Sequence, residues 1–317
     1  MVVKRSPLLL VPDITTGFLC LFFAVCEFSL IGKRSVKIGD YAFDHGAWMG
    51  IIFFASAVAL PFLITLMEKS RNILVGWVRM FYPMAFFGLF FQQCILVTNI
   101  IYSGKSFDAF FVDVDQWIFG FQPAVEFWRA LPQSPILNEL LFLSYFFFYF
   151  LMAGTCWIAY FRKDRNFAVD AFAIISTAFY LLYIFYIFFP VKGPKYFIPE
   201  LKQTWYGHFE GYIFTEIMKI VFNNVTLSGA AFPSSHAAIS VLSLMLTFRY
   251  SRRLGLAFTP LVLLLLISTV YIYAHYAIDT IAGATLGAIF YFWLPQVVRR
   301  LGSVAKNVEA LFQKWIA

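Results

Sequence analysis

The stretch AFAIISTAFYLLYIFYIFF, residues 171–189, contains no Asp, Glu, Lys or Arg. About 20 apolar residues are enough for one helix to cross the hydrocarbon core of a membrane. This stretch therefore predicts a membrane span at 170–190. Seven further spans follow from similar runs at 10–31, 46–67, 79–102, 138–161, 232–248, 255–275 and 279–298. We predict an all-α fold, a polytopic transmembrane helix bundle of about eight spans.

The composition supports the same class of protein. Of the 317 residues, 61% are hydrophobic and 13% are charged, whereas about 25% of the residues in a soluble protein are charged. The net charge is +7, but Lys and Arg stand in short clusters between apolar runs, as topology signals and headgroup contacts do. We therefore expect contact with the lipid bilayer and none with nucleic acid. The four Cys residues lie inside apolar runs without metal-ligand spacing, so we expect small buried side chains and no disulfide framework.

The basic clusters predict an orientation. Cytoplasmic loops carry an excess of Lys and Arg, and eight spans place the clusters at 161–165, 249–253 and 297–300 on that side. The segment 191–231 and the turn at 275–279 then fall on the external side. We expect an uncleaved first span and an integral membrane protein of a bacterial inner membrane. Its site would face the external, periplasmic or lumenal, side. The sequence leaves the oligomeric state open.

The segment KSFDAFFVDVDQWIFGFQPAVEFWRAL, 105–131, differs from the spans because four acidic residues interrupt it. Its apolar positions recur every three or four residues, which predicts an amphipathic helix at the outer interface, or two helices separated at Gly120 and Pro123. Its role would be to anchor the chain or to roof a lipid-access site. We divide the chain into N-terminal spans (1–75), a core with a six-helix catalytic centre and this interfacial helix (76–300), and a short cytoplasmic tail (301–317).

Two of the four histidines stand at predicted span boundaries on the external side. His275 lies in STVYIYAHYAIDTIAG, 268–283, four residues before Asp279. On a helix this spacing puts both side chains on one face, and a carboxylate bound to one ring nitrogen leaves the other nitrogen free as a base or nucleophile. The alternative is a plain hydrogen bond at a helix turn. The other two histidines, His45 and His208, stand alone in loops, where we expect solvated side chains.

His236 follows Pro233, Ser234 and Ser235. We expect Pro233 at the first position of a helix, because its fixed φ and missing N–H suit that place. The first-turn N–H groups and the two Ser hydroxyls would then form an anion cradle, with His236 as the adjacent titratable group.

A third element, FFPVKGPKYFIP at 188–199, places Lys192 and Lys195 just beyond a span end, with a turn at Gly193-Pro194. Either lysine alone would be an ordinary snorkelling side chain. Together, two lysines, an anion-binding helix start and a His/Asp pair on one face suit phosphoryl transfer through a phosphohistidine. The cations would hold the phosphate oxygens, one His would attack phosphorus, and the other would protonate the leaving oxygen.

The order and spacing of these elements resemble the type 2 phosphatidic acid phosphatase superfamily, over about residues 80–298. Its signature is a Lys/Arg element, then PSGH, then SRxxxxxHxxxD. Here PSSH ends at His236, and the third motif matches at Ser268, His275 and Asp279. FPVKGPKYF is similar to a first element written around GPRYF. Segment 105–131 is similar to a region found in the branch that contains inositol phosphorylceramide synthases.

The resemblance implies His275 as the nucleophile, Asp279 as its orienting partner and His236 as the general acid. It also implies phosphate contacts from a set of four residues: Ser234, Ser235, Lys192 and Lys195. No metal or other cofactor is required in the phosphatase branch. Two positions depart from the family pattern, because Thr269 and Lys195 stand where the family has Arg. With less positive charge, the site would suit a phosphodiester monoanion or have weakened phosphatase activity.

Four functions remain open on the sequence. The favoured one is an integral membrane phosphatase that hydrolyses a lipid phosphate or lipid pyrophosphate, such as phosphatidate or a polyprenyl pyrophosphate. The second is a phosphotransferase that moves a phospho-head group between lipids, as in inositol phosphorylceramide or sphingomyelin synthesis. The others are a non-enzymatic transporter and an inactive relative. Four core spans without ionisable residues argue against the transporter, and the intact His and Asp positions argue against the inactive relative.

Overall fold

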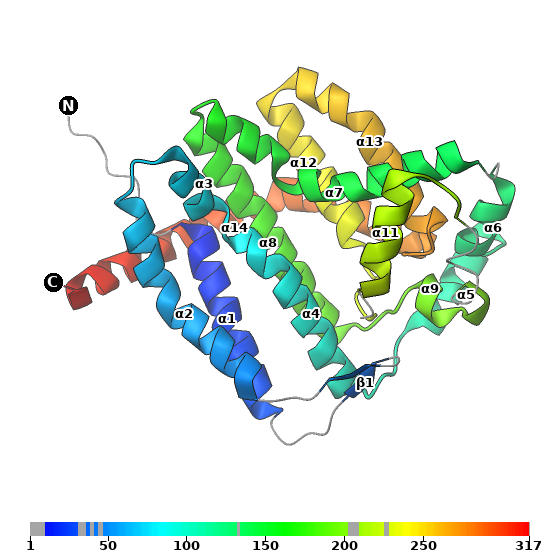
Figure 1. Cartoon of the computed structure of the whole chain (residues 1–317), viewed down its shortest axis with the longest axis horizontal. Helices are drawn as coiled ribbons and strands as arrows, with labels where there is room; N and C mark the ends of the chain where they lie inside the picture. Colours follow the sequence, from blue (N-terminus) through cyan, green and yellow to red (C-terminus); the bar gives the residue numbers. More distant parts are fainter. Residues whose placement is uncertain are drawn as a thin grey trace.

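The structure is a computed structural model that describes residues 10–30, 36–38, 41–43, 47–131, 134–201, 209–224 and 228–316. The helices of this part are α1 (Val11–Ser29), α2 (Ala47–Glu68), α3 (Ile73–Phe81), α4 (Pro83–Tyr102), α5 (Asp108–Phe119), α6 (Pro123–Ala130), α7 (Pro135–Phe161), α8 (Arg165–Phe188), α9 (Pro194–Phe197), α11 (Ile213–Asn224), α12 (Ser235–Tyr250), α13 (Arg252–Tyr271) and α14 (Ala277–Ile316). Two three-residue strands, β1 (Val36–Ile38) and β2 (Tyr41–Phe43), pair antiparallel. The prediction of an all-α polytopic bundle is confirmed (Figure 1).

Within the described residues, seven helical segments are long and apolar enough to cross a membrane. They are Val11–Ser29, Trp48–Glu68, Ile73–Tyr102, Pro135–Phe161, Arg165–Phe188, Arg252–Tyr271 and Ala277–Leu311. The eighth predicted span, 232–248, forms α12, which has 16 residues. At about 1.5 Å per residue, α12 is shorter than the hydrocarbon core, which is about 30 Å thick. The described residues thus hold seven long apolar helices where the sequence predicts about eight spans, and α12 packs against α7, α8, α13 and α14.

Helices α12 and α14 pack closely because two glycines of α14 face α12. A Cβ at Gly283 would lie closer than 3.0 Å to the carbonyl oxygen of Ser234, and one at Gly287 would lie equally close to that of Ala238. Small residues four apart allow this kind of backbone approach between membrane helices. The approach sets the first turn of α12 beside the first turn of α14, where the Ser234 N–H donates to the Asp279 carbonyl oxygen at 3.0 Å.

A buried ion pair joins the N-terminal helix to the bundle. Arg79 donates to Asp13 Oδ1 and Oδ2 at 3.0 and 2.8 Å, and its Nε lies 3.2 Å from Glu68 Oε1. The Tyr82 hydroxyl donates to the same Asp13 carboxylate at 2.9 Å. Asp13 interrupts the first apolar run, and these donors compensate its burial.

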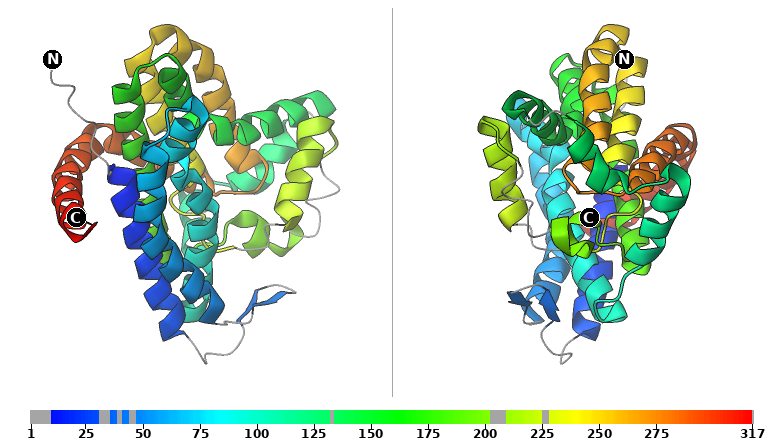
Figure 2. Two further views of the ribbon diagram at one scale, coloured as in Figure 1. Left: turned by 60° about the vertical axis from the view of Figure 1, so that its left-hand side comes forward. Right: turned by 90° about the vertical axis from the view of Figure 1, so that its right-hand side faces the viewer.

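The amphipathic segment forms two helices, α5 and α6, as the second form of the prediction has it. They are separated at Gly120, which has a φ of 74°, and at Pro123, which begins α6. In Figures 1 and 2, α5, α6, α9 and α11 lie together at one side of the long helices. This side carries the candidate site.

Candidate active site

Three chain segments that are far apart in sequence meet where α8 ends and where α12 and α14 begin. The segment after α8 is connected to the segment before α12, because the Ala231 N–H donates to the Val191 carbonyl oxygen at 2.8 Å. It is connected to the segment before α14, because the Lys195 N–H donates to the Tyr273 carbonyl oxygen at 3.0 Å. The three predicted motifs therefore meet.

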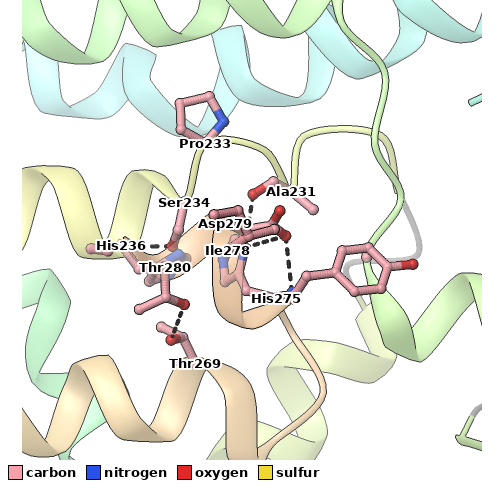
Figure 3. Close-up of polar contacts among 12 residues, drawn as sticks. Ala231, Pro233, Ser234, His236, Thr269, His275, Ile278, Asp279 and Thr280 are labelled. Carbon is pink, nitrogen blue, oxygen red and sulfur yellow. Dashed lines mark hydrogen bonds and ion pairs between the residues drawn. The ribbon is translucent and has the colours of Figure 1, made fainter. Parts of the chain in front are cut away.

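His275 lies just before α14, and its ring is buried. Its Nδ1 is 2.8 Å from the carbonyl oxygen of Ala231 (Figure 3). A carbonyl can only accept, so Nδ1 carries the proton and Nε2 keeps a free lone pair. Burial lowers the pKa of His275 to about 4, although the bond to Ala231 opposes this shift. The imidazole is therefore neutral near pH 7, which is the state a nucleophile needs.

Asp279 holds the turn that carries His275. Its Oδ2 accepts the Tyr276 N–H at 2.9 Å and lies 3.7 Å from His275 Nδ1. The imidazole Nδ1 donates to the Ala231 carbonyl oxygen and does not make the expected direct hydrogen bond to Asp279, whose near oxygen accepts a backbone N–H. Its other oxygen, Oδ1, is buried without a hydrogen-bond partner. A carboxylate at 3.7 Å from the ring nitrogen would stabilise a positive charge on the imidazole.

His236 lies in the first turn of α12 between two aromatic rings. Ring centroids are 4.4 Å apart with Tyr145 and 4.3 Å apart with Phe148. Its Nδ1 is 3.5 Å from the Tyr145 hydroxyl. The centroids of His236 and His275 are 5.9 Å apart. The structure thus brings together the two histidines that the sequence places 39 residues apart.

The two serines before His236 do different things. Ser234 is the N-cap of α12, and its Oγ accepts the Ala237 N–H at 3.3 Å. The prediction that Pro233 begins the helix is wrong, because this cap makes Ser235 the first helical residue. Ser235 lines a cavity beside His236, whereas Ser234 is fully buried behind it.

Both predicted lysines line the same cavity. Lys195 is buried, its Nζ lies 4.7 Å from the ring centroid of Phe222, and burial lowers its pKa to about 8. The turn between the lysines requires glycine, because Gly193 has a φ of 89° and a Cβ there would meet the Ala274 carbonyl oxygen at 2.7 Å. The predicted Gly-Pro turn is confirmed.

The cavity has a volume of about 280 Å³, and the two histidines and the two lysines are among the residues that line it. Beyond these polar groups, its wall consists mostly of apolar and aromatic side chains from α4, α7, α8 and α11. They include Phe87, Phe91, Ile95, Phe148, Met152, Phe179, Met218, Val221 and Phe222. A few polar side chains and a mostly apolar wall match a ligand with a phosphate head and a hydrocarbon tail.

The PAP2 superfamily matches residues 110–293, which is more than half of the chain. The chain belongs to the PAP2 superfamily. All seven predicted site residues lie inside the matched range. A search of curated proteins and a search of solved structures each gave no match. Membership supports a lipid enzyme of the phosphatase or phosphotransferase type.

Thr269, at the position where related PAP2 motifs have Arg, is fully buried. Its hydroxyl is 2.8 Å from the Thr280 hydroxyl, and its carbonyl oxygen accepts the His275 N–H at 3.0 Å. Thr269 therefore fixes the turn between α13 and α14 and supplies no cation. His45 and His208 lie outside the described residues.

Sequence reasoning missed two acidic residues of α5 and the carbonyl of Ala231. Asp108 and Asp115 are fully buried behind this PAP2 site. Their signal in the sequence is a spacing of seven, with Phe111 on the same helix face. No sequence pattern identifies the Ala231 carbonyl as the acceptor for His275. Across the described part of the chain, no group of three or more His, Cys, Asp or Glu side chains is placed to hold a metal ion, and metal-free chemistry stays a prediction.

Proposed function

We propose that this PAP2 protein is an integral membrane phosphatase that hydrolyses a lipid phosphate or lipid pyrophosphate through a phosphohistidine intermediate. One observation carries the proposal. His275, with Nδ1 occupied by the Ala231 carbonyl, shares a cavity with His236, two lysines and a mostly apolar wall.

Binding begins with the phosphate at the polar side chains of the cavity. Lys192 and Lys195 neutralise its charge, and the first turn of α12 contributes N–H groups at Ser235 and His236. The hydrocarbon tail lies along the aromatic wall, away from water. Bound phosphate also favours the protonated form of His236, because an adjacent negative charge stabilises the imidazolium.

The chemistry then has two steps. His275 Nε2 attacks phosphorus, the bond from phosphorus to the lipid oxygen breaks, and His236 gives its proton to that oxygen. This leaves a phosphohistidine and a lipid alcohol, or a lipid phosphate when the substrate is a pyrophosphate. In the second step His236 takes a proton from water, the water oxygen attacks phosphorus, and phosphate leaves. Asp279 stabilises the positive charge on the His275 ring during both steps.

Transfer to a lipid alcohol is the second candidate, and two observations favour it. Thr269 is bound to Thr280, so the phosphate lacks the cation that PAP2 motifs place there. Two lysines suit a diester monoanion better than a monoester dianion. The apolar wall of the cavity also suits a second lipid more than water. In this case the acceptor hydroxyl replaces water in the second step.

The site is proposed to face the external side of the membrane. The turns at 162–164 and at Ser251, inside two basic clusters, lie at the end of the bundle opposite the starts of α12 and α14 (Figure 1). The positive-inside rule then puts the site outside. A bacterial inner membrane stays a prediction.

The test uses purified protein in lipid nanodiscs beside a His275→Ala variant. Phosphatidate and a polyprenyl pyrophosphate report hydrolysis, and phosphatidylinositol with ceramide reports transfer. We expect phosphate release by the wild type, an acid-labile phosphoenzyme, and loss of both in the variant. Head-group transfer without phosphate release would favour the second candidate. Equal rates in wild type and variant would refute the site. Substrate movement across a bilayer without bond cleavage would make the protein a transporter.

A further inference from the structure

Helix α5 carries two fully buried carboxylates, Asp108 and Asp115. They stand two turns apart on one face, with buried Phe111 between them. Neither carboxylate lines the cavity described above. Buried carboxylates are retained only with good donors, and the donors of both residues belong to the candidate site.

Asp115 binds the N-terminus of α14. Its Oδ2 accepts the Ala277 N–H at 2.9 Å, and its Oδ1 accepts the Ile278 N–H at 3.0 Å. These N–H groups have no partner within their own helix, and a carboxylate there is also favoured by the helix dipole. Asp115 therefore fixes the start of the helix whose first turn holds Asp279 and which His275 just precedes.

Asp108 binds the backbone of the turn between Lys192 and Lys195. Its Oδ2 accepts the Lys192 N–H at 2.8 Å, and its Oδ1 accepts the Gly193 N–H at 2.8 Å. The same Oδ1 accepts the hydroxyl of Tyr276, the residue after His275, at 3.0 Å. One carboxylate thus connects the segment that carries the phosphate cations to the segment that carries the nucleophile.

Phe111 completes the contact with the third segment. Its ring centroid lies 4.5 Å from that of Phe232, which precedes the first turn of α12. The same ring lies 6.1 Å from Phe189 and 6.2 Å from Tyr276. One face of α5 therefore touches all three segments of the site.

We propose that Asp108 and Asp115 are positioning residues. They hold the turn between Lys192 and Lys195 and the start of α14, next to His275, at the spacing that phosphoryl transfer needs. The inference rests on the proposed function. It adds a second role to α5, whose composition predicts an interfacial anchor. The outer face still suits anchoring, because Phe110 and Trp117 are 59% and 85% exposed. Because Asp108 acts through Lys192, its loss weakens substrate binding. Because Asp115 acts through His275, its loss slows the chemical step.

The experiment compares Asp108→Asn, Asp115→Ala and Asp115→Asn with Asp113→Asn in nanodiscs. Asp113 lies on the exposed face of the same helix and is the matched control. We expect KM to rise about tenfold in Asp108→Asn and kcat to fall about tenfold in Asp115→Ala, as expected when hydrogen bonds to a charged group are lost. Asp115→Asn keeps one acceptor oxygen and should recover part of the lost kcat. Asp113→Asn should match the wild type in both constants.

Thermal unfolding of each variant separates positioning from folding. Unchanged kinetic constants in folded Asp108→Asn and Asp115→Asn, beside an active wild type, would overturn the inference alone. The inference would also be overturned if the fall in kcat and the rise in KM both followed a lower unfolding temperature in every variant. If Asp115→Ala does not fold, the two Asn variants decide between these results. If the wild type formed no phosphoenzyme and showed no turnover, the proposed function would be refuted, and this inference would be refuted with it.

Discussion

Replacing Gly283 by Ala should damage the site more than it damages the fold. The added Cβ would lie closer than 3.0 Å to the Ser234 carbonyl oxygen, and 3.1 Å from the Ala237 Cβ. These are a backbone atom and a short side chain, so neither can turn away. Helix α14 must move away from α12 by roughly one ångström to restore ordinary contact.

This movement would separate the two reacting groups, because Ser234 precedes His236 on α12 and Asp279 follows His275 on α14. A 1 Å misplacement can cost about 100-fold in rate, so we expect kcat to fall about 100-fold. The overpacking penalty is about 1–3 kcal/mol, while replacing Gly in a helix returns about 0.5–1 kcal/mol. We therefore expect only a small fall in unfolding temperature.

The assay is phosphate release from a lipid phosphate in nanodiscs, with thermal unfolding of the same sample. Gly302→Ala is the matched control on α14, because the nearest atom to its Cβ would be Val11 Cγ2 at 3.9 Å. It should keep wild-type kcat. A Gly283→Ala protein with wild-type kcat would refute the argument that close packing of α12 and α14 sets the distance between the histidines.

Three further predictions concern the site and the N-terminal helices. His236→Ala should lower the rate of the first step, measured as leaving-group release in a single turnover, about 100-fold or more on alkyl phosphates but affect nitrophenol release from nitrophenyl phosphate much less, because that leaving group needs no proton; equal single-turnover losses on both substrates would argue against a general acid. Burial lowers the pKa of His275 to about 4, that of Lys195 to about 8 and that of His236 below its ordinary value. We therefore expect kcat/KM to fall as pH drops through about 4, where the nucleophile is protonated, to decline gradually as pH rises above the lowered pKa of His236, where the general acid is lost, and to fall more steeply above about 8, where the Lys195 cation is lost. Lys195→Arg should move the alkaline limb upward, since guanidinium stays charged, and an unmoved limb would show that another group causes it. Arg79→Leu should destabilise the fold by about 3–5 kcal/mol, since it leaves Asp13 buried without its ion pair, and should leave KM unchanged in the protein that remains folded; an unchanged unfolding temperature would contradict this.

The long apolar helices and the motifs of the candidate site were predictable because both depend on local signals. Apolar run length identifies membrane helices, and the motifs around His236 and His275 have fixed spacing. For residues 232–248, apolar content alone did not predict how the helix is packed. Its apolar content is that of a span, but its length and burial belong to a short helix enclosed by others. Hydropathy measures the first property and is insensitive to the second.

Contacts between distant segments were not predictable. The Ala231 carbonyl occupies His275 Nδ1, and a backbone atom leaves no trace in residue type. Asp108 and Asp115 interrupt an amphipathic pattern, which on its own indicates solvent-facing acids, yet both are buried. Only the fold supplies the N–H groups that make this burial stable.

The sequence by itself determined that the chain is an all-α membrane protein, and it indicated two histidines, an aspartate, two serines and two lysines as candidates for a phosphate site. It could do so because composition and motif spacing are read within single segments. The tertiary structure decided which groups face the cavity and which hold it together. It assigned Ser235 to the cavity and Ser234 to the helix cap, and it gave α5 three site segments to contact. These assignments depend on distances between segments up to 170 residues apart in the chain, such as the 3.0 Å between the Tyr276 hydroxyl and Asp108, and no local pattern encodes such a distance.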